Sequence, residues 1–351
     1  MKHFRAGLCF LMMIWAMAEV EADKKPKAFS SGTHFPEYHD YGSSAPEPDR
    51  DDPLHPMLGI PVENRQQMEK KCKNITRIRY GYSAKWTDAP FQVSIRRLDL
   101  DRWESFGMGH YCSGSIIANN AILTSGSCLK GQGRAEIGVV VGTLNRRKAI
   151  LEATQLLFPA NIIVHPRYLS ENDPRFDIGL VLTSRRMEIG PKVAKIKIDL
   201  NAPSARTKCK TYGWGITSEF GADYTDCLQR AALSIVDRRD CRSLTTEYIT
   251  NSTLCARSSL DSDPCTADLG SPVVCNGKLS GIVTRKDGCE GTAHADTHMS
   301  LFQHKQWIKK LLTEYHVRSD DDADSGARLV YTSRIYVAMG VFAFILGTCI
   351  F

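Results

Sequence analysis

The chain has 351 residues, of which 42% are hydrophobic and 24% are charged, a composition typical of a globular protein with a sizeable core. Its net charge of +6 comes from 45 lysines and arginines set against 39 acidic residues. The sequence contains neither a long basic run nor an RNA-type aromatic platform, so we expect no nucleic-acid partner.

The amino terminus has the pattern of a secretory signal peptide over residues 1–18. Lys2 and Arg5 precede the apolar run AGLCFLMMIWAMA, whose small final residues suit cleavage before Glu19, with Ala22 as a second candidate. The sequence therefore predicts a secreted protein.

Residues 19–77 are expected to form a flexible pro-segment. Most of this region is rich in proline, serine, glycine and acidic residues, and it shows no apolar period of 2 or 3.6 residues that could bury a face. Asn74, near its end, and Asn251, further along the chain, stand in Asn-x-Ser/Thr sequons. Both sequons predict N-glycosylation, in agreement with secretion.

Residues 78–315 have the pattern of an all-β domain that ends in one helix. Short β-branched and aromatic runs recur between turn residues: FQVSI, GSIIANNAILTS, EIGVVVG, IIVHP, IGLVL, KIKIDL, SPVVC and LSGIVT. Closely spaced short strands predict a β-barrel or sandwich. The predicted helix is Gln303–Tyr315, in which Trp307, Ile308, Leu311 and Leu312 share one face.

The carboxyl terminus predicts membrane attachment. Residues 316–334 read as an acidic tether and polar spacer, and residues 335–351 form an apolar stretch of about 25 Å as a helix, slightly short for a membrane core. Small residues at 325–327 before the spacer favour a glycosylphosphatidylinositol (GPI) anchor attached at Ser325. A single membrane-spanning helix is the alternative.

The cysteines predict a disulfide framework. Of the twelve, Cys9 lies in the signal peptide and Cys349 in the apolar tail, which leaves ten in the mature chain. An even number in a secreted chain implies five bridges. The histidines are scattered, so we expect neither a metal site nor a cofactor.

Several motifs occur in the order found in trypsin-like serine proteases. IRYG at Ile78 stands where that family has its activated amino terminus, and APFQVSI follows where a first strand is expected. HYCSGSIIANNAILTSGSC resembles the histidine segment, DIGL the aspartate strand, Gly213–Gly215 the Gly-Trp-Gly strand, and CTADLGSPVVC the nucleophile segment. Over residues 77–312 the chain resembles this family, which implies two packed antiparallel β-barrels with a C-terminal helix.

The resemblance also implies the disulfide pairing. It pairs Cys112 with Cys128, Cys209 with Cys275, Cys241 with Cys255, and Cys265 with Cys289. Cys72 and Cys227 remain for the fifth bridge, and Cys227 matches a family position that is often tied to the start of the domain.

The resemblance places Ser127, Asp177 and Leu269 at the three catalytic positions, so only the aspartate is retained. A hydroxyl cannot serve as the general base, and a leucine side chain cannot attack a carbonyl. Ala267 replaces a glycine of the oxyanion hole, where a methyl group adds bulk. We do not expect His110 to replace the base or Ser271, expected in a hydrogen-bonded turn, to replace the nucleophile.

The same resemblance outlines a specificity pocket and an activation site. Asp263 matches the acidic pocket floor of trypsin-like enzymes, and Thr284 a serine that hydrogen-bonds the triad aspartate. Bulky charged residues at other pocket positions are expected to narrow the entrance: Arg285, Lys286 and Asp296. The resemblance places the activation cleavage site between Arg77 and Ile78, and Asp268 matches the residue that accepts the new amino terminus after cleavage. Whether Arg77 is cut stays open.

Three functions follow from these residues. The first is a secreted, membrane-tethered, non-catalytic homologue that binds a protease, an inhibitor or a receptor. The second is a serine endopeptidase with a preference for basic residues, which Asp263 suggests. The third is a structural or adhesive surface module.

Overall fold

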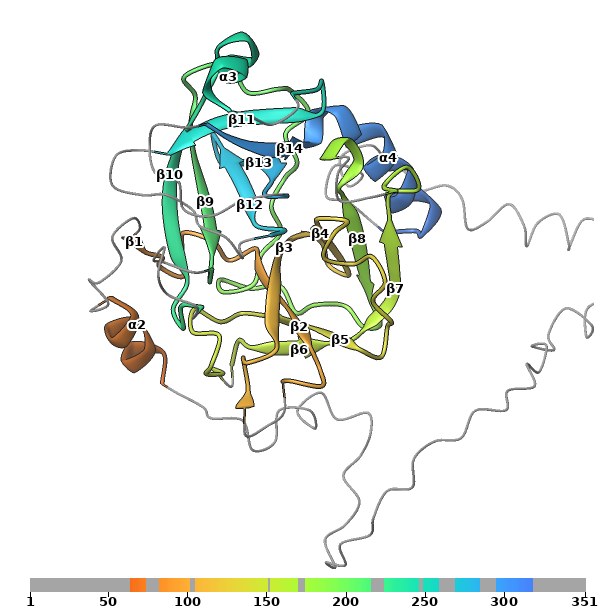
Figure 1. Ribbon diagram of the computed structural model, residues 1–351. Coiled ribbons are helices and arrows are strands. Elements are labelled where there is room, and N and C mark those ends of the chain that lie inside the picture. The colour runs from red at the N-terminus through yellow and green to blue at the C-terminus, as the bar shows by residue number, and fades with distance from the viewer. Residues whose placement is uncertain are drawn as a thin grey trace, which may run out of the picture. The chain divides into compact units, whose positions relative to one another are not determined.

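The computed structural model describes residues 64–73, 82–101, 105–150, 152–169, 174–215, 224–245, 249–258, 269–284 and 295–317. Two antiparallel sheets of seven strands each account for its strands, and they lie side by side (Figure 1). The expected all-β class is therefore confirmed.

The first sheet closes into a barrel. Its strand order is β1-β10-β11-β14-β13-β12-β9, and β9 also pairs with β10 along six residues. This pairing closes the strands from β10 to β9 into a ring, and β1 adds to the outside of β10. Its strands are β1 (Tyr82–Ser83), β9 (Lys208–Gly213), β10 (Gln229–Ile235), β11 (Thr253–Ser258), β12 (Pro272–Cys275), β13 (Lys278–Ile282) and β14 (Asp296–Ser300).

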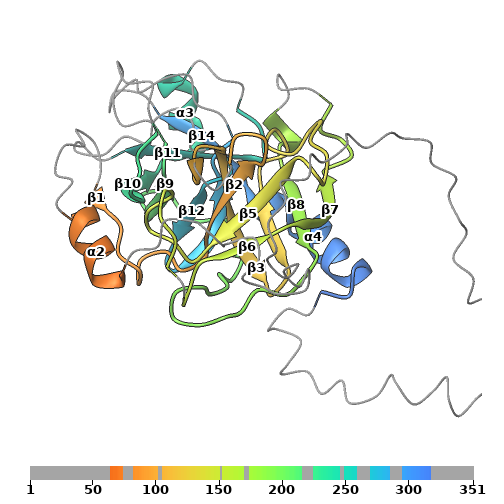
Figure 2. The same ribbon diagram turned by 90° about the horizontal axis from the view of Figure 1, so that it is seen from below.

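The second sheet curls into a half-barrel, in the order β6-β5-β2-β3-β4-β8-β7 (Figure 2). Its strands β4, β5 and β8 are buried at every position, which explains why their sequences are continuous apolar runs rather than alternating ones. The strands are β2 (Gln92–Arg97), β3 (His110–Ala118), β4 (Ala121–Thr124), β5 (Ile137–Val141), β6 (Gln155–Leu157), β7 (Pro159–Val164) and β8 (Gly179–Thr183).

Three α-helices and a 3₁₀ turn complete the described elements: α2 (Arg65–Lys73), η3 (Pro174–Phe176), α3 (Arg238–Leu244) and α4 (Leu301–Glu314). Helix α4 confirms the predicted C-terminal helix, starting two residues earlier, directly after β14. It buries Ile308 and Leu311 as expected, together with His304, and it lies beside β7 and β8 in both views. Within the described residues, no helix is both long and apolar enough to cross a membrane.

Two sequence-based predictions are corrected here. Residues 65–73 of the pro-segment are helical, because Met68 and Cys72 lie on one face and are buried against the domain, at 0% and 2% exposure. The KIKIDL run is not a strand of either sheet. It forms part of the connection between the sheets, with a single parallel bridge from Ile198 to Leu279.

Four of the five implied disulfides are formed: Cys72–Cys227, Cys112–Cys128, Cys209–Cys275 and Cys241–Cys255. The fifth, Cys265–Cys289, lies outside the described residues. The first of these bridges spans 155 residues and fastens α2 to the segment before β10. Helix α2 therefore belongs covalently to the barrel domain, although it precedes the expected cleavage site.

Candidate active site

The structure gathers the three expected catalytic positions near the contact between the two sheets. Strands β4 and β8 pair antiparallel, with Thr124 opposite Gly179. The loop after β4 therefore lies beside the end of η3, which brings Ser127 next to Asp177. Leu269 belongs to the segment that leads into β12 of the other sheet.

Asp177 receives two hydrogen bonds from Ser127. The Ser127 backbone N–H donates to Oδ1 at 2.6 Å, and its hydroxyl donates to Oδ2 at 3.0 Å. Asp177 is 4% exposed, whereas Ser127 is half-buried. Hydrogen bonds to a buried carboxylate stabilise its charged form. Ser127 thus supplies one donor to each carboxylate oxygen.

The loop that carries Ser127 is held on both sides. The hydroxyls of Ser125 and Ser127 are 3.0 Å apart, and the Tyr111 hydroxyl donates to the Cys128 carbonyl at 2.9 Å. Burial raises the pKa of Tyr111, so this phenol stays protonated and remains a donor. The Cys112–Cys128 bridge ties the same loop to β3.

Leu269 is fixed where the two sheets meet. Its carbonyl accepts the Ser113 N–H of β3 at 2.8 Å, and its side chain packs against the main apolar core. The next residue, Gly270, has φ of +81°, and a Cβ there would stand 2.1 Å from the Ser113 carbonyl oxygen. Only glycine fits so close an approach with this backbone conformation.

His110 contacts a serine hydroxyl and two aromatic rings. Its Nδ1 lies 2.8 Å from the Ser94 hydroxyl, and its ring packs edge-on against Trp214 and Tyr224. Burial lowers the pKa of His110 well below its ordinary value, and the neighbouring positive charges of Arg96 and Arg146 lower it further.

The other predicted site residues have different outcomes. Ser271 and Thr284 are buried, and Asp296 is half-buried in β14. The Ser271 backbone carbonyl accepts the Val283 N–H, but its hydroxyl has no partner among the described residues, so the expected turn hydrogen bond is not a side-chain one. Residues that lie outside the described ranges are Asn74, Arg77, Ile78, Asp263, Ala267, Asp268, Arg285, Lys286 and Ser325.

Aromatic side chains of α4 pack with those of two other segments next to the aspartate. Phe176, directly before Asp177, stacks on His165 with ring centroids 4.9 Å apart. His304 of α4 meets the His165 ring edge-on at 5.5 Å, and Trp307 lies at 4.9 Å from the same ring. The C-terminal helix therefore supports the loop that positions Asp177.

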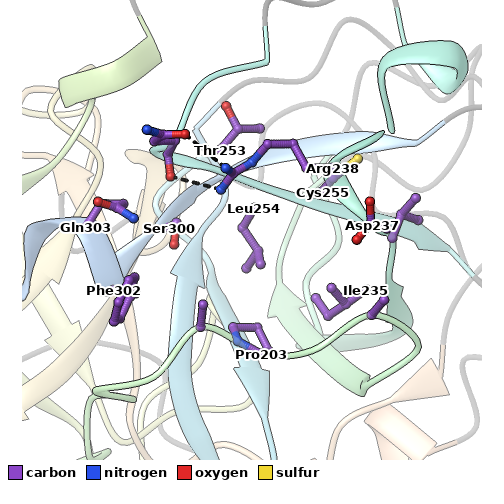
Figure 3. A pocket seen from close by; sticks show the side chains of 14 residues that line it. Pro203, Ile235, Asp237, Arg238, Thr253, Leu254, Cys255, Ser300, Phe302 and Gln303 are labelled. Carbon is purple, nitrogen blue, oxygen red and sulfur yellow. Dashed lines mark hydrogen bonds between the residues drawn. The ribbon is translucent and has the colours of Figure 1, made fainter. Parts of the chain in front are cut away.

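A separate pocket of about 320 Å³ lies in the barrel that holds α3 (Figure 3). The sequon residue Asn251 is exposed at its rim and accepts a hydrogen bond from Arg238. Sequence reasoning identified the sequon but missed Arg238, because the two residues are thirteen positions apart and only Asn251 lies inside the Cys241–Cys255 loop. No local pattern indicates that contact.

Comparison with known proteins agrees with this architecture. The family described as Trypsin matches residues 78–308. Serine protease 1 from Homo sapiens is 30% identical over 235 residues, which cover 66% of this chain and 88% of that protein. Trypsin-3 from Homo sapiens is 30% identical over 269 residues, covering 73% and 83% respectively.

A solved structure of neuropsin, a serine protease expressed in the limbic system of mouse brain, superposes with a TM-score of 0.59. It is 25% identical and covers 66% of this chain and 98% of its own. The family match, the curated relatives and the shared fold agree, and the chain belongs to the trypsin family.

Proposed function

We propose that this chain is a non-catalytic trypsin-family protein that acts outside the cell by binding a protein partner. The observation that carries the proposal is the pair of hydrogen bonds from Ser127 to Asp177. In this family's mechanism the aspartate orients a histidine, which removes the proton of the attacking serine. Here a serine contacts both oxygens of the aspartate.

The chemistry of the neighbouring groups supports the proposal. A serine hydroxyl does not take up a proton near neutral pH, so Ser127 cannot be the general base. Leu269 offers no atom that could form an acyl intermediate. Loss of the serine or the histidine alone costs about a million-fold in rate in a related triad, or about 8 kcal/mol. Residual turnover should therefore be far below that of a protease.

The alternative is a serine endopeptidase with a preference for basic residues. The names of the relatives, serine protease 1 and trypsin-3, favour it, and so does Asp263 if it stands at the pocket floor. Such an activity would need a base and a nucleophile other than Ser127 and Leu269. This alternative makes activity the first property to measure.

Secretion and membrane attachment complete the proposal. The signal peptide over residues 1–18 and the apolar tail at 335–351 support a GPI-anchored protein on the outer cell surface. The partner classes that suit a protease fold without turnover are a protease, an inhibitor or a receptor. Surface loops around the two sheets would make the contact.

The test is peptidase activity of the purified, secreted protein, before and after cleavage at Arg77. We expect no turnover of fluorogenic peptides with basic residues before the scissile bond, and no labelling by a fluorophosphonate probe. The double variant Ser127→His, Leu269→Ser restores both triad groups. Activity in this variant would show that the assay and the cleft are competent.

A matched variant separates real activity from contamination. Asp177→Asn keeps the size of the side chain but removes its charge. Wild-type turnover that persists through repurification and falls in Asp177→Asn would overturn the proposal in favour of the endopeptidase. Turnover that is equal in both proteins would identify a contaminating protease.

Anchoring has its own assay. A phosphatidylinositol-specific phospholipase should release the protein from intact cells, and Ser325→Trp should reduce its surface display because a bulky residue blocks the attachment site. Retention on the membrane after phospholipase treatment would favour the membrane-spanning alternative.

A further inference from the structure

Asn251 is presented at an exposed turn beside a pocket. The turn closes through a hydrogen bond from the Thr253 N–H to the Thr250 carbonyl at 3.2 Å, and the Thr253 hydroxyl accepts the Thr250 N–H at 3.0 Å. Asn251 is exposed at the tip, and Leu254, two residues beyond Ser252, is buried. An accessible asparagine in a surface turn is the setting in which N-linked sugars are found.

Arg238 fixes the orientation of the asparagine amide. Its Nη1 donates to Asn251 Oδ1 at 2.9 Å and its Nη2 donates to the Asn251 backbone carbonyl at 3.5 Å. Because the carbonyl oxygen takes this bond, the amide nitrogen Nδ2 remains for substitution. Both terminal nitrogens of Arg238 are directed to Asn251, which makes the guanidinium a support for the asparagine rather than a site for an anion.

The pocket next to this amide has an apolar floor. In Figure 3, Leu254 projects between Phe302 and Ile235, with Pro203 at the lower edge and Arg238 above. Polar groups from Asp237, Ser300 and Gln303 stand around the floor. A volume of about 320 Å³ is at the small end of ligand pockets. It suits one sugar ring, whose faces are apolar and whose edges carry hydroxyl and amide groups.

We propose that Asn251 carries an N-linked glycan whose first N-acetylglucosamine packs into this pocket. In the attachment reaction Asn251 Nδ2 loses one proton and bonds to C1 of the sugar, and the pyrophosphate of a lipid-linked oligosaccharide donor leaves. The Oδ1 atom keeps its hydrogen bond from Arg238. The acetamide methyl and one ring face then cover Leu254 and Phe302. The inference rests on the secretion part of the proposed function.

The test uses the full chain expressed in secreting cells. Mass spectrometry of glycopeptides first establishes occupancy at Asn74 and Asn251. The folded protein is then treated with a peptide N-glycosidase, which cuts the bond between asparagine and sugar. At Asn251 we expect release at least about tenfold slower than from the denatured protein, because the linkage is covered. An endoglycosidase that leaves the first sugar in place should not lower the melting temperature.

Two variants address the geometry separately. Arg238→Ala should remove most of the protection by freeing the amide, whereas Arg242→Ala, an exposed arginine of the same helix, should leave it unchanged. Ala205→Phe should also speed release, because the added ring fills part of the pocket that the sugar would occupy.

The results that would overturn this inference differ from those that would overturn the proposed function. An unmodified Asn251 beside a modified Asn74, or equal release from folded and denatured protein, would overturn this inference and leave the proposed function intact. Two unmodified sequons would also count against secretion. Neither result depends on peptidase activity, so the two proposals fail separately.

Discussion

Acidification should destabilise the protein through His304. This side chain is 4% exposed, and its Nε2 has no partner among the described residues. Burial lowers the pKa of His304 to about 4, the charge of His165 adds to this effect, and a backbone hydrogen bond with Arg175 opposes it. The pKa of His165 is also lowered, by burial and by Arg167.

The sign and size of the effect follow from linkage. Between the ordinary histidine pKa of 6.5 and the folded value of about 4, the unfolded chain binds a proton at His304 and the folded chain does not. Stability is therefore complete above pH 6.5, falls as the pH drops through this window, and levels off below it. From pH 7 to pH 4.5 the loss from His304 alone is about 2 kcal/mol.

Urea unfolding at the two pH values measures this loss. The variant His304→Gln should lose about 2 kcal/mol less than wild type on acidification, because its side chain does not titrate. His316→Gln replaces an exposed histidine just beyond α4 and serves as the matched control. If His304→Gln keeps the wild-type pH dependence, the assignment of the acid sensitivity to this buried ring is wrong.

Three further predictions concern stability. Asp101→Asn should lower the free energy of unfolding in urea by about 3–5 kcal/mol, because the buried guanidinium of Arg96, at 0% exposure, loses the carboxylate that lies 3.0 Å away. The double change Arg96→Met, Asp101→Leu should lower it less, because neither charge remains. Gly270→Ala should abolish secretion of folded protein in a yield assay, since its Cβ would meet the Ser113 carbonyl. Trp214→Ala removes a fully buried ring and should lower the free energy of unfolding by about 3–5 kcal/mol in urea unfolding.

Much of the fold could be predicted from the sequence, because local pattern and tertiary environment agree there. The EIGVVVG and IGLVL runs became β5 and β8, whose positions are all buried. Three of the four described disulfides followed from the resemblance, since their cysteines occupy positions that the family pairs. The fourth, Cys72–Cys227, followed because these two cysteines remained. The spacing of apolar residues predicted the C-terminal helix and two residues of its buried face, Ile308 and Leu311.

The remaining features depend on contacts between distant residues. Helix α2 has little apolar content and is held by Met68 and by the bridge to Cys227, so its own sequence gives no sign of order. The Ser127–Asp177 contact joins residues fifty positions apart and depends on the register of β4 against β8. The histidine pair of His165 and His304 likewise arises only when α4 packs beside β7.

The closure of the first sheet has a consequence for association. A strand edge with free N–H and C=O groups invites another chain to add to the sheet. In the described part of the chain, the barrel joins β9 to β10, and its added strand β1 has only two residues. The half-barrel ends in the three-residue β6 and in β7, which begins with Pro159. Such edges disfavour pairing between molecules, so contacts with a partner should depend on side chains and loops rather than on strand addition.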